Sequence, residues 1–163
     1  MKKLLFIAAL ATVAVSCGNK DDGINTGGSI YLVGLHWDER NAKDYATFDE
    51  ANELAASLGK RLPTVEEFEQ LCELPSVWDN DKKGFWFAEN ENDFKNVEKS
   101  LFLNAKGGRN TDGDMVAVDR SCRYWSSIVS DDTLAYGVGL DTIQLYISTL
   151  YKTVGMSARC VKD

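Results

Sequence analysis

Two stretches of helical periodicity, each opened by a capping box, restrict what this chain can fold into. In the first, ATFDEANELAASLGK, Thr47 and Glu50 form the box, and Gly59 stands where helices commonly end. In the second, TVEEFEQLCE, the box is Thr64 and Glu67. Within each stretch, apolar residues recur with helical spacing. The two stripes comprise Phe48, Ala51, Leu54, Ala55 and Leu58, and then Val65, Phe68, Leu71 and Cys72.

The remainder of the chain is typical of short strands. SIYLVGLHW precedes the helices and predicts one strand with Tyr31, Val33, Leu35 and Trp37 on one face. After Pro75, short apolar runs are separated by Gly, Asn and Asp: GFWFA, SLFLNA, MVAV, RYWSS, LAYGVGL, TIQLYIS and MSARCVK. This order predicts an α+β fold with two helices packed on irregular antiparallel sheets.

The N-terminus has the layout of a bacterial lipoprotein signal. Two lysines precede an apolar run that is too short to span a membrane, and small residues then lead to Cys17. Residues 1–16 are therefore expected to be a signal peptide, with Cys17 as the lipidation site and 17–28 as a flexible tether. Residues 29–163 are expected to form one domain. CGNKDD resembles the signal that exports such proteins to the outer surface of the outer membrane.

The net charge of the chain limits the kinds of molecule that it can bind. The formal net charge is −7, and loss of Lys2 and Lys3 with the signal peptide changes it to −9. A domain with this balance lacks the basic footprint that binding to nucleic acid requires. The membrane is expected to be reached through the lipid anchor alone.

Three cysteines remain in the predicted domain, and outside the cytosol they could form disulfides. Cys72 faces the core from the second helix, and Cys160 lies on the last strand. We predict a Cys72–Cys160 disulfide, which would stabilise the fold by about 4–5 kcal/mol in the chain-entropy model. Pairings of Cys122 with Cys160 or with Cys72 stay open.

Several segments resemble one family in order and spacing. They are GKRLPTVEEFEQLCE, GFWFA, SLFLNAKGGRN, YWSS, LAYGVGL and GMSARCVKD. Together they resemble C-type lectin-like domains of the formylglycine-generating-enzyme subtype. The closest resemblance is to the Fibrobacter succinogenes major paralogous domain and to the variable proteins of diversity-generating retroelements. It covers residues 30–163 and implies a compact fold whose termini meet in one sheet.

In retroelement-diversified relatives, the stretch from YWSS to the terminal R-C-V carries a variable ligand-binding face. Within TIQLYIS, we expect Ile143, Leu145 and Ile147 to face inward and the intervening residues to face outward. Tyrosines among hydrogen-bonding side chains suit recognition of a protein or glycan on another cell, phage or host surface. The predicted ligand-binding residues are Tyr124, Tyr136, Gln144, Tyr146, Ser148, Thr149, Tyr151 and Lys152. Trp125 is expected to be structural.

An enzyme is a weaker reading of the same chain. Its one histidine, His36, is expected to be exposed, so a histidine-based nucleophilic site is not favoured. Formylglycine-generating enzymes oxidise a substrate cysteine at a copper-binding cysteine pair, whereas here Cys122 would stand alone. We therefore expect no catalytic residues and no cofactor, with a formylglycine-type oxidase as the least favoured alternative. A fixed adhesin or glycan-capture component is the other.

Acidic clusters are the remaining candidates for metal binding. They are Asp79, Asn80 and Asp81; Asn110, Asp112 and Asp114; and Asp131 with Asp132. None has the glycine and distal glutamate of an EF-hand loop. Asn and Asp at these positions are typical of turns, so no metal site is predicted.

Overall fold

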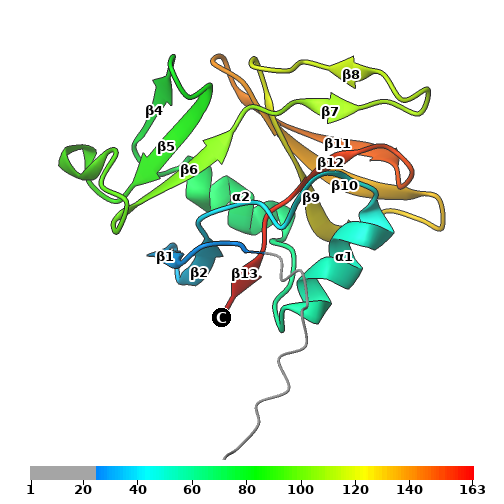
Figure 1. The fold of residues 1–163 in the computed structure, drawn as a ribbon, viewed down its shortest axis with the longest axis horizontal. Coiled ribbons are helices and arrows are strands. Elements are labelled where there is room, and N and C mark those ends of the chain that lie inside the picture. The colour runs from blue at the N-terminus through cyan, green and yellow to red at the C-terminus, as the bar shows by residue number, and fades with distance from the viewer. Residues whose placement is uncertain (1–24) are drawn as a thin grey trace, which may run out of the picture.

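The computed structural model describes residues 25–163 (Figure 1). The expected signal peptide, the lipidation site Cys17 and the tether up to residue 24 lie outside the described residues. Within 25–163, no helix is long and apolar enough to cross a membrane.

The first and last strands share a three-stranded sheet. β1 (Ser29–Leu32) and β2 (Leu35–Asp38) form a hairpin, and β13 (Val161–Lys162) pairs antiparallel with β2. The prediction of a single strand over SIYLVGLHW is therefore wrong. Val33 (φ 47°) and Gly34 (φ 81°) both adopt positive φ, as a two-residue type I′ turn requires. The turn reverses the phase, so Tyr31 is exposed while Leu35 and Trp37 are buried.

A five-stranded sheet forms the centre of the domain. Its order is β11 (Leu145–Tyr151), β10 (Leu134–Leu140), β9 (Cys122–Val129), β12 (Met156–Ala158) and β3 (Lys43–Ala46). Every pair in it is antiparallel except β9 with β12, which is parallel. β11 is an edge strand, and β10 and β11 form a hairpin (Figure 1).

Two smaller antiparallel sheets complete the strands. β4 (Ser76–Asp79), β5 (Gly84–Ala88) and β6 (Ser100–Asn104) form one, with the 3₁₀ turn η1 (Glu91–Asp93) between β5 and β6. β7 (Gly108–Arg109) and β8 (Met115–Val116) form the other. The α+β class predicted from the sequence is confirmed.

Both predicted helices and both capping boxes are present. α1 (Phe48–Ser57) is capped by Thr47, and α2 (Val65–Cys72) is capped by Thr64. Phe48, Ala51 and Ala55 of α1 are buried, and so are Phe68 and Leu71 of α2, whereas Leu54 and Leu58 are only half-buried.

The two helices contribute to different core clusters because side chains of β9 alternate. Tyr124 packs in one cluster with Phe68 of α2, and Trp125 packs in the other with Phe48 of α1. Trp125 is fully buried, and its indole N–H donates to the carbonyl of Ala46 at 2.8 Å. α1 and α2 therefore cover opposite faces of the central sheet, and Trp125 has the structural position expected.

The cysteines do not form the predicted disulfide. Cys72, Cys122 and Cys160 are all free thiols. Cys72 packs against the cluster on the α2 side of the sheet, whereas Cys160 belongs to the cluster on the α1 side. The prediction failed because neither strand phase nor helix periodicity says which face of the sheet each helix covers.

Candidate functional site

The predicted ligand-binding residues lie mostly on the β10–β11 hairpin but on two faces of it. In the register, Tyr136 is opposite Thr149 and Gly139 is opposite Tyr146. Side chains alternate along each strand, so Tyr136, Thr149 and Tyr151 share one face, whereas Tyr146 and Ser148 lie on the other. The predicted set is therefore not one continuous surface.

The first face carries a patch of exposed and half-buried side chains, which we call the hairpin strip. It comprises Leu134, Tyr136, Ile147, Thr149 and Tyr151. Val138 lies on the same face and is buried against the α2 cluster, which covers one end of this face only. In the part of this face that the α2 cluster does not cover, Tyr151 is 60% exposed and Ile147 is 38% exposed.

The inward orientation predicted for two isoleucines is wrong. Ile143 is 87% exposed and lies in a turn, where its N–H and that of Gln144 donate to the carboxylate of Asp141. Gln144 is exposed as expected. Leu145 packs against the α2 cluster, whereas Ile147, on the same face of β11, is 38% exposed.

The second face forms a groove against the β7–β8 hairpin, which we call the sheet groove. Two adjoining cavities of about 230 and 110 Å³ make it up, and they share Arg123, Leu150 and Met156. Gly137 and Gly139 form part of the sheet beneath it. A Cβ on Gly139 would lie 2.1 Å from the Tyr146 ring, so glycine at this position allows the ring to lie directly on the sheet.

Tyr146 and Ser148 therefore line a groove rather than project into solvent. The Tyr146 hydroxyl is 2.6 Å from the hydroxyl of Ser121, which fixes the ring over the sheet. Arg123, which was not among the predicted residues, lies on this same face of β9. The sequence does show Arg123 alternating with the apolar Tyr124. Without the strand register, however, the face of the sheet that carries Arg123 could not be assigned.

Tyr124 is not on an outward face. It is 1% exposed, and its hydroxyl donates to the side-chain oxygen of Asn104 at 2.8 Å. Burial raises the pKa of its phenol above the usual value. Lys152 is half-buried, with its ammonium 3.1 Å from the carbonyl of Asp132 and 5.7 Å from the centre of the Phe48 ring.

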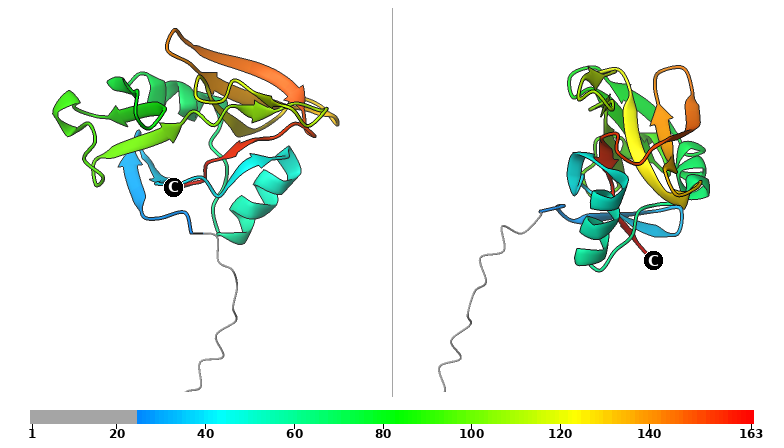
Figure 2. Two further views of the ribbon diagram at one scale, coloured as in Figure 1. Left: turned by 45° about the horizontal axis from the view of Figure 1, so that its top comes forward. Right: turned by 90° about the vertical axis from the view of Figure 1, so that its right-hand side faces the viewer.

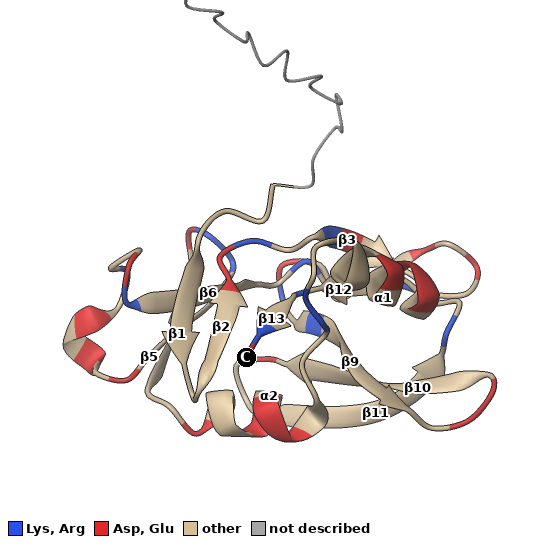
Figure 3. Ribbon diagram, turned by 90° about the horizontal axis from the view of Figure 1, so that it is seen from below, with Lys and Arg blue, Asp and Glu red and all other residues tan. Residues whose placement is uncertain are grey.

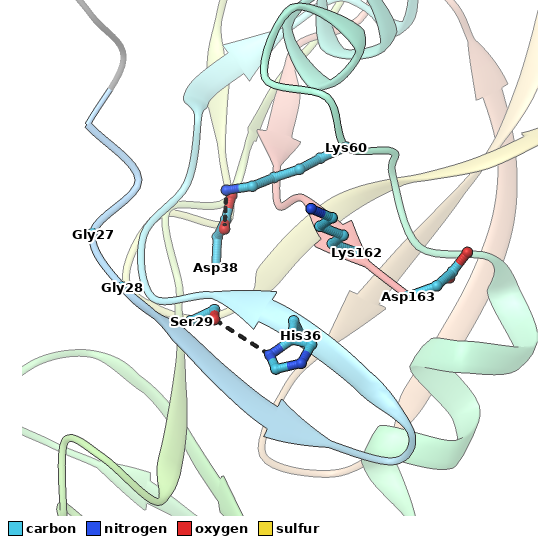
Figure 4. Close-up of a pocket in the computed structure, with 8 residues that line it drawn as sticks. All are labelled: Gly27, Gly28, Ser29, His36, Asp38, Lys60, Lys162 and Asp163. Carbon is cyan, nitrogen blue, oxygen red and sulfur yellow. Dashed lines mark hydrogen bonds and ion pairs between the residues drawn. The ribbon is translucent and has the colours of Figure 1, made fainter.

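A third feature, the terminal pocket, lies between the first and last described residues (Figure 4). This cavity of about 480 Å³ is lined by Gly27, Gly28, Ser29, His36, Asp38, Lys60, Lys162 and Asp163. Asp38 is buried, and its Oδ1 accepts a hydrogen bond from Lys60 at 2.5 Å, while its Oδ2 has no partner within 25–163. His36 is exposed as predicted, 3.4 Å from the Ser29 hydroxyl.

The described thiols are poorly suited to nucleophilic or redox chemistry. Burial raises the pKa of Cys72 and of Cys122 to about 12, and that of Cys160 to about 11. The Cys122 thiol also donates to the carbonyl of Leu103 at 3.2 Å. At neutral pH all three are therefore protonated, whereas the thiolate is the reactive form.

The acidic clusters hold turns together. Asn110 accepts hydrogen bonds from the N–H groups of Asp112 and Asp114. Asp131 accepts three bonds from Thr133 and Leu134. No group of three or more metal-ligating side chains gathers anywhere in residues 25–163.

Comparisons of the chain with family models, with curated proteins and with solved structures found no match.

Proposed function

We propose that this chain is a lipid-anchored bacterial surface protein whose C-type lectin-like domain binds a protein or glycan ligand without performing chemistry. The observation that carries the proposal is the hairpin strip with its exposed Ile147 and Tyr151. Its strands β10 and β11 lie on the far side of the domain from the first described residues (Figure 2). A tether attached at those residues would direct the strip away from the membrane.

The composition of the strip suits recognition. Tyr136 and Tyr151 offer broad ring surfaces with few rotatable bonds, and Thr149 adds a hydroxyl between them. Ile147 contributes an apolar contact that is already partly desolvated. Such aromatic and aliphatic contacts dominate the free energy of association at protein interfaces.

The lectin-like assignment is supported by two features of the fold. β13 pairs with β2, so the ends of the described chain meet in one sheet, as the resemblance implies. Arg61 of the RLPT segment pairs through its backbone with Val161, which joins two of the resembling segments directly.

A non-enzymatic role and a partner other than nucleic acid are supported by chemistry and charge. The three described thiols have raised pKa values, which disfavours the copper–thiol chemistry of formylglycine-generating enzymes. Acidic residues lie along both helices (Figure 3), and the chain has 25 acidic against 18 basic residues. Nucleic acid would be repelled by that distribution.

Binding is tested with the full chain on glycan and protein arrays. Tyr151→Ala and Ile147→Ala are expected to weaken binding of any array partner about five- to thirtyfold. Val97→Ala removes an equally exposed apolar side chain elsewhere and should leave the affinity unchanged. Equal effects of all three variants, or no array partner for the wild-type chain, would contradict the proposal.

Anchoring is tested separately in bacterial cells. Wild-type chain should incorporate labelled palmitate and be cleaved by protease added to intact cells. Cys17→Ser should lose the label. A labelled chain that only becomes protease-sensitive after the outer membrane is broken would retain the anchor and refute surface exposure.

A further inference from the structure

Arg123 is a guanidinium without a partner on the floor of the sheet groove. Its side chain lies beside Gly108, where an added Cβ would be 3.4 Å from the arginine Cδ. Its Nε is enclosed and has no hydrogen-bond partner, and no ion pair within residues 25–163 involves it. The two terminal amino groups of Arg123 also have no hydrogen-bond partner within residues 25–163 and, unlike the enclosed Nε, they are the donors that an acceptor in the groove can reach.

The surroundings indicate the chemistry of that acceptor. No Asp or Glu lines either cavity of the groove, although acids outnumber bases in the chain. Arg109 at the rim already donates to the carbonyl of Tyr45 at 3.2 Å. One unpaired guanidinium therefore remains, and its planar donors match a planar carboxylate.

The larger cavity of the groove is otherwise mostly apolar. Leu150 and Met156 lie over Gly137, where an added Cβ would be 2.8 Å from the Met156 sulfur and 3.1 Å from a Leu150 methyl. Ser148, on the same face of β11, adds one hydroxyl to the lining of this cavity. A cavity of about 230 Å³ with one cationic end and apolar walls favours a ligand with one carboxylate and one apolar side chain.

We propose that the sheet groove binds the C-terminal carboxylate of a peptide whose last residue is apolar. The carboxylate accepts hydrogen bonds from Arg123 and Ser148, and the last side chain lies against Leu150 and Met156. The adjoining cavity of about 110 Å³ extends toward β7 and receives the preceding residue. This inference rests on the proposed function and specifies the group that a protein ligand presents.

The test uses N-acetyl-alanyl-leucine, its C-terminal amide and glucuronate, each titrated into the full chain. Binding is followed by NMR at the Arg123 Nε–H and the Met156 methyl. The peptide acid should shift both signals to saturation with a Kd of about 1 mM or tighter, and the amide should bind about tenfold more weakly or worse. Equal binding of the amide, stronger binding of glucuronate, or no saturable shift with the acid would overturn the proposal.

Variants separate recognition from folding. Arg123→Gln should abolish the response to the acid, Arg123→Lys should retain part of it, and Arg120→Gln should leave it unchanged because Arg120 is exposed outside the groove. All three should keep the thermal unfolding midpoint near that of the wild type. Loss of the response in Arg120→Gln as well would show a nonspecific charge effect and refute the assignment.

The outcome differs from that of the array experiment. An array partner whose affinity changes with Tyr151→Ala but not with Arg123→Gln would refute the groove and leave the proposed function standing. A saturable response to the peptide acid, without any array partner, would support the groove and contradict the proposed function.

Discussion

Arg159 shows how a charged side chain can organise this core without an ion pair. It is 1% exposed, and its guanidinium donates to the Asn41 side chain and to the carbonyls of Asp38 and Phe102 at 2.6–3.0 Å. These acceptors lie at the end of β2, in the β2–β3 connection that follows it, and in β6. One side chain near the C-terminus therefore links three parts of the chain that are distant in sequence.

Removing the Arg159 side chain should strongly destabilise the fold. Arg159→Ala leaves buried acceptors without donors, and we expect it to lower the free energy of unfolding by about 3–5 kcal/mol. Urea denaturation of the full chain measures the change. Arg120→Ala, an exposed arginine, should change it by about 0.5 kcal/mol or less. A similarly small effect at Arg159 would show that these hydrogen bonds do not stabilise the fold.

Asp79 gives the protein a pH dependence in acid. Its carboxylate accepts hydrogen bonds from the Trp86 indole N–H and from the N–H groups of Asp81 and Lys82. These bonds lower its pKa to about 2. Because the unfolded value is about 4, the stabilisation is complete above pH 4 and is lost as the pH falls toward 2.

Asp79→Asn should flatten that dependence. The measurement is the thermal unfolding midpoint between about pH 5 and pH 2, compared with that of the wild type. The wild-type midpoint should fall more steeply than that of the variant, while Asp112→Asn, an exposed acid, should follow the wild type. Identical slopes for wild type and Asp79→Asn would contradict this role.

At the residue scale, sequence indicates chemistry but not surroundings. Arg123 and Arg159 each lie next to buried residues in a strand or its continuation, and nothing in the sequence distinguishes them. Arg159 has all its partners within the fold, whereas Arg123 faces a groove. The difference depends on side-chain contacts over long sequence distances, which local pattern does not contain.

Among the elements, the helices were predictable, whereas the strand boundaries and the burial of strand faces were not. Each capping box lies within four residues of sequence, so α1 and α2 could be located directly. The β1–β2 turn was missed because Val33 occupies a positive-φ position usually taken by Asn, Asp or Gly. The alternation along β11 was predicted correctly, but the burial of its two faces was not, because Ile147 is exposed while Tyr146 and Ser148 line a groove.

The sheet groove depends on a contact between two neighbouring strands. Gly139→Ala would place a Cβ 2.1 Å from the Tyr146 ring, and we expect it to destabilise the fold by about 1–3 kcal/mol. The same substitution in a Tyr146→Ala background should cost much less, because the ring that it meets is gone. A double-mutant cycle by chemical denaturation gives the coupling. Equal costs in both backgrounds would mean that the ring does not require glycine.

For the whole molecule, the order of elements in the sequence predicts the α+β class. Which helix covers which face of the central sheet is known only from the structure. Cys72 and Cys160 illustrate this limit of prediction from sequence. Both are in apolar patterns, yet they belong to clusters on opposite faces of the central sheet. The sheet that separates these clusters also depends on the parallel pairing of β12 with β9, segments more than thirty residues apart that no local pattern connects.

This layering also predicts where the domain can vary. In the retroelement-diversified proteins that the sequence resembles, the gene would change codons for ligand-contacting residues and spare those that pack on both sides of the sheet. Between residues 124 and 151, the buried set comprises Tyr124, Trp125, Ser126, Ala135, Gly137, Val138 and Gly139. We expect these seven to stay invariant, because substitution at buried or closely packed positions is destabilising.

Deep sequencing of the gene and its flanks, from many cells of one lineage, tests this expectation. Adenine-directed changes should gather at exposed or half-buried positions such as Tyr136, Ile147, Thr149 and Tyr151, with a reverse transcriptase encoded nearby. Changes spread equally over buried and exposed codons would contradict the assignment of this face. A gene without variation would favour a fixed adhesin, because the exposed hairpin strip is available to one constant partner as readily as to many.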